Sequence, residues 1–271
     1  MIPLDEAFRP GVRPGAAGGR MTRDPAPEAQ ATGHVDLRVV TYNIHRCRGL
    51  DGRVRCDRIA EVLAPLDADV IALQEVVGSG ASGPGHAEAL GAALGMGWVL
   101  APARHLRGRL FGNMILTRFP VRHHLRYDLS WKTCEPRCAQ RADLVVGGHV
   151  IHVYNVHLGT AVFERREQAR RLAALVRDRR VTGPKILLGD FNEWLGGRAT
   201  AILAGTLHSV DLRRHLRRRG TYPGFFPVLH LDHIYFEGGR VEVRGVQLPR
   251  TRTSLVASDH LPLVADLRIR F

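Results

Sequence analysis

Residues 185–194 read KILLGDFNEW and combine an apolar strand with polar side chains at its end. Residues 186–188 form a short apolar run with the length of a buried strand, and Gly189 permits a tight turn directly after it. Asp190 and Asn192 follow, and residues two apart in an extended chain point to one face, so a carboxylate and an amide leave this strand side by side. A carboxylate can hold a hard cation or orient water, and an amide can bind a phosphate oxygen. Asp and Asn are also ordinary turn residues, so the alternative to a functional site is a capped turn after a core strand.

The composition points to a large basic domain. The chain has 271 residues, 45% of them hydrophobic, which is enough to bury one large α/β core or two smaller ones. The formal net charge is +13, and Lys132 and Lys185 are the only lysines among 39 basic side chains. Such a charge favours an anionic partner, such as nucleic acid, phospholipid headgroups or a phosphorylated small molecule. Arginine suits these partners because its planar fork matches phosphate oxygens.

The four cysteines are Cys47, Cys56, Cys134 and Cys138. The last two have a spacing that suits half a metal site or a local disulfide, but the first two do not supply a second tight pair, so the sequence disfavours a zinc site. We therefore expect reduced thiols in a cytoplasmic protein. No apolar run approaches the length of a membrane span, and the N-terminus lacks the apolar core of a signal peptide.

The N-terminal segment differs from the rest of the chain. Residues 1–33 are rich in proline, glycine and alanine and show no periodicity, which is typical of a disordered leader. Acidic and basic side chains balance within this segment, so the net charge of +13 belongs to residues 34–271. These remaining residues are expected to form one folded domain.

A strand, a helix and a second strand are expected at the start of this domain. Residues 37–42 and 70–73 have the apolar runs of strands, and an amphipathic stripe over residues 59–66 indicates a helix between them. A right-handed crossover makes the two strands parallel and brings their ends to one edge of the sheet. Asn43 and Glu75 follow these strands, so we expect them at the same edge, where α/β proteins place their sites.

Further polar side chains flank other predicted strands. Asn113 comes directly before a strand at residues 114–116, and a hairpin over residues 142–156 leads to Asn155 and His157, which share one face. A lone histidine at such a position is more often structural. The polar residues around it favour a role at a site.

An aspartate and an adjacent Asp–His pair stand before the last core strands. Asp232 opens a strand that includes residues 234–236, and Asp259 and His260 precede the final strand. An imidazole can bind or protonate a phosphoryl oxygen, and a carboxylate can hold its tautomer. His260 is therefore a candidate phosphate ligand or acid, and Asp232 is a candidate partner that orients it.

Seven segments of the chain read, in order, TYNIH, LQEV, FGNMILTRFP, YNVHLG, LLGDFNEW, LDHIYF and SDHLPL. In order and spacing they resemble the endonuclease/exonuclease/phosphatase superfamily, to which DNase I, exonuclease III type AP endonucleases, inositol-polyphosphate 5-phosphatases and neutral sphingomyelinases are similar. The resemblance extends over residues 37–271 and is greatest to small bacterial members. It implies a four-layer α/β sandwich, in which two mixed β-sheets pack face to face with helices outside, as in DNase I.

The resemblance also implies roles for the residues at matching positions. The positions that match metal ligands, for Mg²⁺ or Mn²⁺, are Asn43, Glu75 and Asp259. The positions that match the catalytic set are Asp190, Asn192, His157, His260 and Asp232. Further candidate contacts to the substrate phosphate are Asn113, Arg137 and Asn155. In this pattern Asp190 acts on the attacking water, while Asn192 and His157 contact the phosphate.

These implications predict a divalent-metal-dependent phosphoester hydrolase that uses in-line attack by water. The predicted substrate is a phospholipid or another phosphodiester. We expect the protein to be a monomer that binds peripherally to an anionic membrane, such as the inner membrane surface. A nuclease acting on DNA or RNA is the first alternative, since the basic body fits nucleic acid equally well. The sequence shows no obvious aromatic platform for stacking single strands. The second alternative is a phosphate-binding module of the same fold that does not catalyse.

Overall fold

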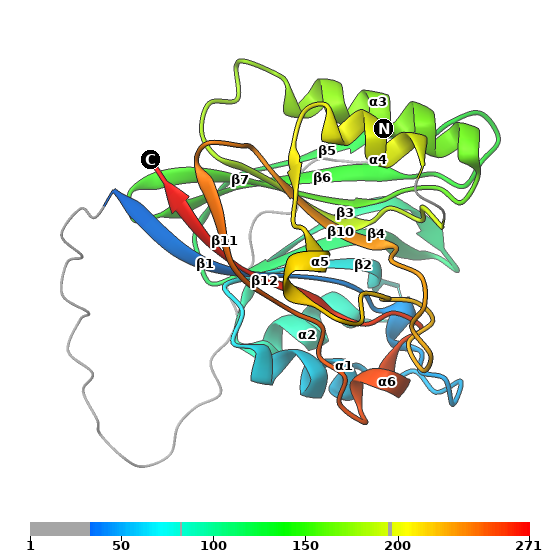
Figure 1. Cartoon of the computed structure of the whole chain (residues 1–271). Helices are drawn as coiled ribbons and strands as arrows, with labels where there is room; N and C mark the ends of the chain where they lie inside the picture. Colours follow the sequence, from blue (N-terminus) through cyan, green and yellow to red (C-terminus); the bar gives the residue numbers. More distant parts are fainter. Residues whose placement is uncertain (1–32, 82, 195–196) are drawn as a thin grey trace, which may run out of the picture.

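The computed structural model describes residues 33–81, 83–194 and 197–271. In this part of the chain two six-stranded β-sheets pack face to face, with helices on both outer sides (Figure 1). The predicted four-layer sandwich is therefore confirmed. The predicted leader covers residues 1–33, and all of it except Gly33 lies outside the described residues.

The first sheet has the strand order β11-β12-β1-β2-β4-β3. Its strands are β1 (His34–Asn43), β2 (Val70–Gly80), β3 (Gly97–Leu106), β4 (Arg109–Thr117), β11 (Val241–Gln247) and β12 (Leu263–Arg270). As predicted, β1 and β2 are parallel, and helix α1 (Cys56–Leu63) lies between them in the chain. This pairing sets Asn43, the last residue of β1, opposite Gln74 of β2.

The second sheet has the strand order β5-β6-β7-β8-β10-β9. Its strands are β5 (Val121–Asp128), β6 (Cys138–Val146), β7 (His149–His157), β8 (Lys185–Asp190), β9 (His208–Ser209) and β10 (Asp232–Phe236). β7 and β8 are parallel around helix α3 (Val162–Val176), while β8 and β10 are antiparallel. The second sheet thus repeats the strand–helix–strand arrangement of the first.

One apolar core fills the space between the sheets, and another lies on the outer face of each sheet. Val39 of β1 packs between the sheets, whereas Val40 packs on the side of α1 and α2 (His86–Leu94). In β8, Leu188 packs between the sheets and Leu187 packs on the side of α3 and α4 (Arg198–Ala204). Strands buried on both faces need continuous apolar runs, which explains the run in residues 186–188. Each such side chain contributes about 1.5–3 kcal/mol through burial.

The ends of several central strands meet at one edge of the sandwich. Because β10 is antiparallel to β8, its first residue, Asp232, lies opposite Asp190, the last residue of β8. β12 likewise begins beside the end of β1, where Leu263 pairs with Thr41. The remaining short helical turns are η1 (His45–Cys47), η2 (Ala64–Leu66), α5 (Leu212–His215) and α6 (Ser254–Ala257). No helix in the described ranges has both the length and the apolar character needed to cross a membrane.

β2 differs from its prediction in a way that affects Glu75. The strand does not end at residue 73 but continues to Gly80, so Glu75 lies inside it. The pairing of β2 with β4 shifts register between Leu73 and Val76, and Glu75 has a left-handed φ of 58°. A bulge of this kind interrupts the alternation of side chains and redirects one of them. Glu75 therefore owes its direction to a bulge and not to a strand end.

Candidate active site

The carboxylate of Asp190 lies at the centre of a buried polar cluster at this edge. Asp190 is the last residue of β8 and is 1% exposed. It stands in register with His157 at the end of β7 and with Asp232 at the start of β10. Strand pairing therefore brings together three residues that the sequence places far apart.

Side chains from both sheets approach one oxygen of this carboxylate. Asn43 Nδ2 donates a 3.0 Å hydrogen bond to Asp190 Oδ2, and the Nε2 atoms of His157 and His260 lie 3.4 Å and 3.6 Å from the same oxygen. The other oxygen, Oδ1, accepts a 2.9 Å hydrogen bond from the backbone N–H of Asn192. Both oxygens accept from fixed donors, so the carboxylate is held in one orientation.

His260 is held between two aspartates. Its Nδ1 donates a 2.9 Å hydrogen bond to Asp232 Oδ2, and its Nε2 faces Asp190. Burial alone lowers the pKa of His260, but the charges of Asp232 and Asp190 outweigh burial and raise this pKa to about 10. His260 is therefore an imidazolium at neutral pH. Oδ1 of Asp232 is buried and has no hydrogen-bond partner among the described residues.

Burial shifts the pKa values of both Asp190 and His157 in the direction that favours their neutral forms. Burial raises the pKa of Asp190 to about 6, with a further contribution from Asp232 and opposition from His260. Burial, together with the charges of Arg137 and His260, lowers the pKa of His157 well below its usual value. Arg137 donates a 3.1 Å hydrogen bond to His157 Nδ1, so the neutral ring carries its proton on Nε2, toward Asp190. An aspartate with a pKa near 6 is ionised at neutral pH and is a stronger base than an exposed one.

The side chains predicted to bind a metal have the chemistry that Mg²⁺ or Mn²⁺ requires. Asn43 lies within the buried cluster, whereas the side chains of Glu75 and Asp259 are 21% and 31% exposed. Two adjacent residues of η1 contact them: Arg46 Nε lies 3.5 Å from Glu75, and His45 Nδ1 lies 3.7 Å from Asp259. Mg²⁺ prefers oxygen donors and keeps several water ligands, so partly exposed carboxylates and an amide oxygen are suitable donors for it.

A second set of possible ligands is formed by Asp190, Asp232 and His260, whose ligand atoms lie within 4.8 Å of one another. His260 already donates its Nδ1 proton to Asp232, and a cation bound at this imidazole must displace a proton. The three groups are better explained as a hydrogen-bonded acid–base set. The oxygen atoms of Glu75 and Asp259 are the more suitable ligands for a hard cation.

Asn155 and Asn113, two of the predicted phosphate contacts, are buried and hydrogen-bonded to protein groups, and their contact with phosphate stays a prediction. Asn155 shares a face of β7 with His157, as predicted, but it lies two residues, or about 7 Å, deeper along the strand and is fully buried. Its amide donates to backbone carbonyls of β2 and β4 over 2.9 Å, and its oxygen accepts from Gln74. Asn113 lies inside β4, and its amide donates to the backbone carbonyl of Cys138 over 3.1 Å. Both amides therefore connect the two sheets.

Arg137 lies on the side of the His157 ring that faces away from Asp190. Its guanidinium contacts His157 Nδ1, and Nη2 lies 2.9 Å from a carboxylate oxygen of Glu135. Arg137 is 9% exposed, so most of its surface is already covered by protein. This position makes Arg137 a positioning residue for His157, while its predicted direct contact with phosphate stays a prediction.

Sequence reasoning missed a group of aromatic side chains beside His260. Tyr222 packs on His260 with ring centroids 5.0 Å apart, and Trp194 lies 6.2 Å from Tyr222. Trp194 is 53% exposed, and Phe225 and Phe226 in the loop after Tyr222 are 64% and 68% exposed. Grouped exposed aromatic side chains are typical of binding surfaces. The sequence shows an FF pair and a tryptophan after the strand, but not that the two loops meet.

A model of the Endonuclease/Exonuclease/phosphatase family matches residues 40–260 of the chain. This range begins within β1 and ends at His260, so it includes every polar side chain of the cluster around Asp190.

Individual proteins are similar over nearly their whole length. The chain is 29% identical to the uncharacterized protein YbhP of Escherichia coli, over 88% of this chain and 98% of that protein. It is also similar in structure to the mannosyl-6-phosphatase Bt3783 of Bacteroides thetaiotaomicron, with a TM-score of 0.69, 20% identity, and coverage of 85% of this chain and 99% of the other. A second similar structure is D. rerio TDP2 complexed with single strand DNA product, with a TM-score of 0.67, 17% identity, and coverage of 86% of this chain and 98% of the other. At these identities the two structural likenesses show a shared fold.

Proposed function

Because the chain belongs to the Endonuclease/Exonuclease/phosphatase family, whose members hydrolyse phosphoester bonds, we propose that it is a divalent-metal-dependent phosphodiesterase. Its proposed substrate is a phospholipid or another phosphodiester. The observation that carries the proposal is the buried carboxylate of Asp190, which accepts a hydrogen bond from Asn43 and faces the imidazoles of His157 and His260. A base, a neutral imidazole and an imidazolium at one point suit hydrolysis of an anionic ester.

Asp190 is the proposed general base. Its pKa of about 6 keeps it ionised at neutral pH while it retains more affinity for a proton than an exposed aspartate. Asn43 and the backbone of Asn192 fix its orientation, so it can accept a proton from a water molecule aligned with the phosphorus atom. The water oxygen forms a bond to phosphorus, the ester P–O bond breaks, Asp190 takes one water proton, and the leaving oxygen receives a proton from solvent.

His260, His157 and Asn192 are the proposed stabilisers of the phosphoryl oxygens. An imidazolium held by Asp232 offers a fixed positive charge, and the protonated Nε2 of His157 offers a neutral donor. Asn192 is held by a 2.9 Å hydrogen bond from its amide to the backbone carbonyl of Leu158, which fixes the side chain before substrate arrives. Donors that are oriented in advance are worth more in a buried site than in water.

Glu75 and Asp259, with the amide oxygen of Asn43, are the proposed ligands of Mg²⁺ or Mn²⁺. When bound, the ion would withdraw charge from the phosphoryl and leaving oxygens. Arg46 and His45 already contact the two carboxylates, so these carboxylates lie in a region that accommodates positive charge. Their partial exposure also leaves room for the water molecules that Mg²⁺ retains.

The aromatic side chains beside His260 support a lipid substrate. Trp194, Phe225 and Phe226 project from the loops next to the cluster and are each more than half exposed. Such side chains are suited to the boundary between headgroups and acyl chains of a membrane. The net charge of +13 adds attraction to anionic lipids. We therefore propose peripheral action at an anionic membrane surface on the cytoplasmic side.

A nuclease is the second candidate, and a basic pocket beside the cluster favours it. Arg46, Arg48, Arg107 and Arg109 line one cavity, and Arg46 contacts Glu75 at the site. Arginines gathered in one cavity can bind the phosphates of a nucleic acid strand. The aromatic group that supports a lipid substrate can also stack on unpaired bases.

The reaction is tested with the purified full-length protein and bis-p-nitrophenyl phosphate, with and without Mg²⁺ or Mn²⁺. Hydrolysis is expected with either metal, and Asp190→Ala and His260→Ala should each lose most of it, about 100-fold or more. Asp178→Ala is the matched control, because Asp178 pairs with Arg180 outside the cluster. Full activity in both site variants would refute the assignment of roles. No hydrolysis with either metal would favour the phosphate-binding module.

The substrate is tested by comparing phosphatidylglycerol vesicles with single- and double-stranded DNA. Release of headgroup from vesicles, with little cleavage of DNA, is the expected result. The converse would establish the nuclease, and binding to DNA should then weaken steeply with salt because counterions are released. In each arm Asp190→Ala identifies activity that belongs to this site and not to a contaminant.

A further inference from the structure

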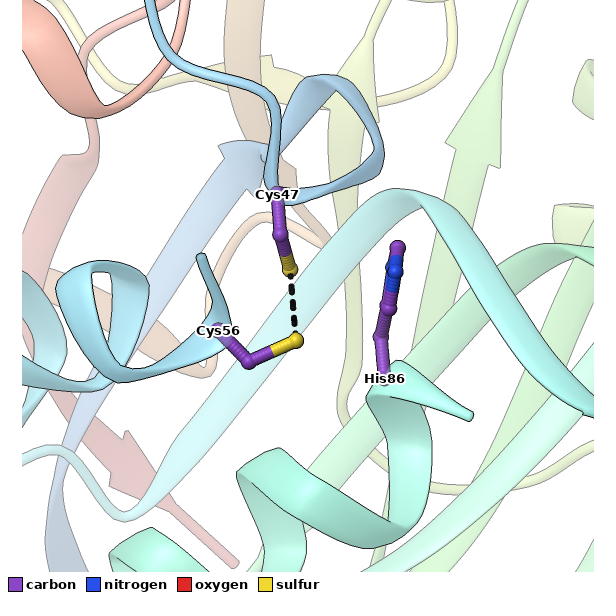
Figure 2. A group of neighbouring side chains, drawn as sticks. All are labelled: Cys47, Cys56 and His86. Carbon is purple, nitrogen blue, oxygen red and sulfur yellow. Dashed lines mark hydrogen bonds between the residues drawn. The ribbon is translucent and has the colours of Figure 1, made fainter. Parts of the chain in front are cut away.

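Two cysteines and a histidine converge beside the turn that follows β1 (Figure 2). Cys47 ends η1, Cys56 is the first residue of α1, and His86 is the first residue of α2. Their potential ligand atoms all lie within 4.8 Å of one another, and the two sulfur atoms are 3.3 Å apart. The spacing of Cys47 and Cys56 in the sequence argues against a site, but the fold supplies His86 as a third group.

The chemical states of His86 and Cys56 suit metal binding. Burial, with the nearby charge of Arg109, lowers the pKa of His86 to about 4, so its imidazole is neutral. His86 Nδ1 is buried and has no hydrogen-bond partner within the described residues. The two sulfur atoms share a hydrogen bond over 3.3 Å, and this contact lowers the pKa of Cys56 and raises that of Cys47, so Cys56 is the readier thiolate. Metal binding favours a thiolate and a neutral imidazole.

We propose that Cys47, Cys56 and His86 bind a borderline-soft divalent cation, for which Zn²⁺ is the best match. Zn²⁺ takes thiolate and imidazole ligands in a tetrahedron, with sulfur atoms about 3.8 Å apart for Zn–S bonds of about 2.3 Å. The observed 3.3 Å separation needs only a small opening to reach this geometry. Two thiolates neutralise the ion, and binding releases their protons to solvent.

A metal satisfies this cluster better than a disulfide. A disulfide requires the two sulfur atoms to approach to about 2.05 Å and leaves the unpartnered nitrogen of His86 unused. A bound ion uses all three groups. Within the described residues the group contains no fourth His, Cys, Asp or Glu ligand, so a water molecule would complete the tetrahedron.

The pocket beside the cluster provides a route for the ion. His86 lines it together with Arg46, Arg107 and Arg109, so the imidazole side of the cluster is reached from a cavity at the surface. Entry from solvent allows the ion to exchange without unfolding of the domain.

Occupation of the cluster would affect the neighbouring site through η1. Cys47 belongs to the same turn as His45 and Arg46, which contact Asp259 and Glu75. An ion on Cys47 would fix the turn that carries these two contacts. The proposed zinc site is separate from the proposed phosphodiesterase chemistry, because none of its ligands belongs to the cluster around Asp190.

The test is a titration of the reduced full-length protein with Cd²⁺ under anaerobic conditions, read by the ultraviolet sulfur-to-cadmium charge-transfer band. This band reports thiolate ligands, so a cation bound by carboxylates does not produce it. One equivalent is expected to saturate the signal. Cys47→Ser and Cys56→Ser should abolish it, His86→Ala should weaken binding by about tenfold or more, and Cys134→Ser is the matched control that should leave it unchanged.

A second measurement protects the test against variants that do not fold. In the wild-type protein, one equivalent of Zn²⁺ should slow alkylation of Cys47 and Cys56 by iodoacetamide but not that of Cys134, as measured by peptide mass spectrometry. A cadmium band that persists in Cys56→Ser, or the absence of both the band and the protection, would overturn the proposal. A Cys47–Cys56 disulfide that forms with glutathione disulfide at the same rate with and without Zn²⁺ would also overturn it. Neither readout depends on phosphodiester turnover.

Discussion

Asp190 and Asp232 stand directly opposite each other across the antiparallel strands β8 and β10, and His260 contacts both carboxylates. The imidazole lies 2.9 Å from Asp232 and 3.6 Å from Asp190. Two buried carboxylates at this proximity repel each other, so a cation between them is needed for both to stay ionised. The protonated His260 supplies that cation, and Asp190 remains available as a base at neutral pH.

The activity should depend on pH through Asp190. Burial raises its pKa from 3.8 to about 6, so the base is protonated and inactive below this pH and ionised above it. We expect kcat/KM for bis-p-nitrophenyl phosphate to rise about tenfold per pH unit below pH 6 and to level off between pH 7 and 8. The profile is measured at saturating Mg²⁺.

His215→Gln is the control for this profile, because His215 is exposed on α5 and should not alter it. A rate that does not change between pH 5 and pH 8 would show that Asp190 is not the titrating base.

The stability of the fold should depend on pH through His260. Its pKa is raised from 6.5 to about 10 in the folded state, so the folded protein holds a proton that the unfolded chain releases in this range. The stabilisation is complete below pH 6.5 and is lost as the pH rises to 10. Over this window the free energy of unfolding should fall by about 1.4 kcal/mol per pH unit at most from this group.

Urea unfolding at pH 7, 8 and 9 measures this slope. Other groups titrate in the same range, so the informative quantity is the difference between the wild type and His260→Gln, which should shrink as the pH rises. A difference that stays constant from pH 7 to pH 9 would contradict the assignment of His260 as a buried imidazolium.

Replacing Glu75 should change how the activity depends on the Mg²⁺ concentration. Replacing its carboxylate by an amide in Glu75→Gln removes a charged oxygen ligand while keeping the size of the side chain. We expect the Mg²⁺ concentration for half-maximal activity to rise about tenfold or more, and chelation by EDTA to stop turnover of the wild type. Glu242→Gln, on the edge strand β11, is the matched control. Equal Mg²⁺ requirements in the two variants would exclude Glu75 as a ligand.

The resemblance of the sequence motifs to a known family implied the sandwich and the residues around Asp190, whereas strand ends by themselves predicted only a shared edge. Parallel strands joined by a helix share an edge, so Asn43 and Glu75 could be placed at one edge from local patterns. Glu75 shows the limit of this reasoning. Its position at the site depends on a bulge inside β2, and a bulge leaves little trace in the hydrophobic pattern.

The depth at which a side chain is buried and the contacts between loops could not be predicted from strand ends. Alternation along β7 predicts that Asn155 and His157 share a face, but not that Asn155 lies between the sheets, bonded to Gln74. The contact of Trp194 with Tyr222, and the meeting of Cys56 with His86, join segments whose separation in the chain hides their proximity. Such contacts depend on how the layers pack and not on the period of any one element.

Membrane binding should depend on the exposed aromatic loop after Tyr222. Phe225 and Phe226 are 64% and 68% exposed, and inserting one such ring into a lipid interface is worth about 1.5–3 kcal/mol. In the double variant Phe225→Ser, Phe226→Ser, sedimentation with phosphatidylglycerol vesicles should weaken by about tenfold or more. Hydrolysis of bis-p-nitrophenyl phosphate should fall much less, because this small diester reaches Asp190 without a membrane.

Leu125→Ser is the matched control for this variant, since it removes an exposed apolar side chain from β5, outside the aromatic group. If charge alone holds the protein on lipid, both proteins should bind equally and 0.5 M salt should release them together. If the rings insert, the control should retain part of its binding at high salt and the double variant should not, because apolar burial is not screened. Equal salt sensitivity of the two proteins would therefore contradict a lipid-facing role for this loop.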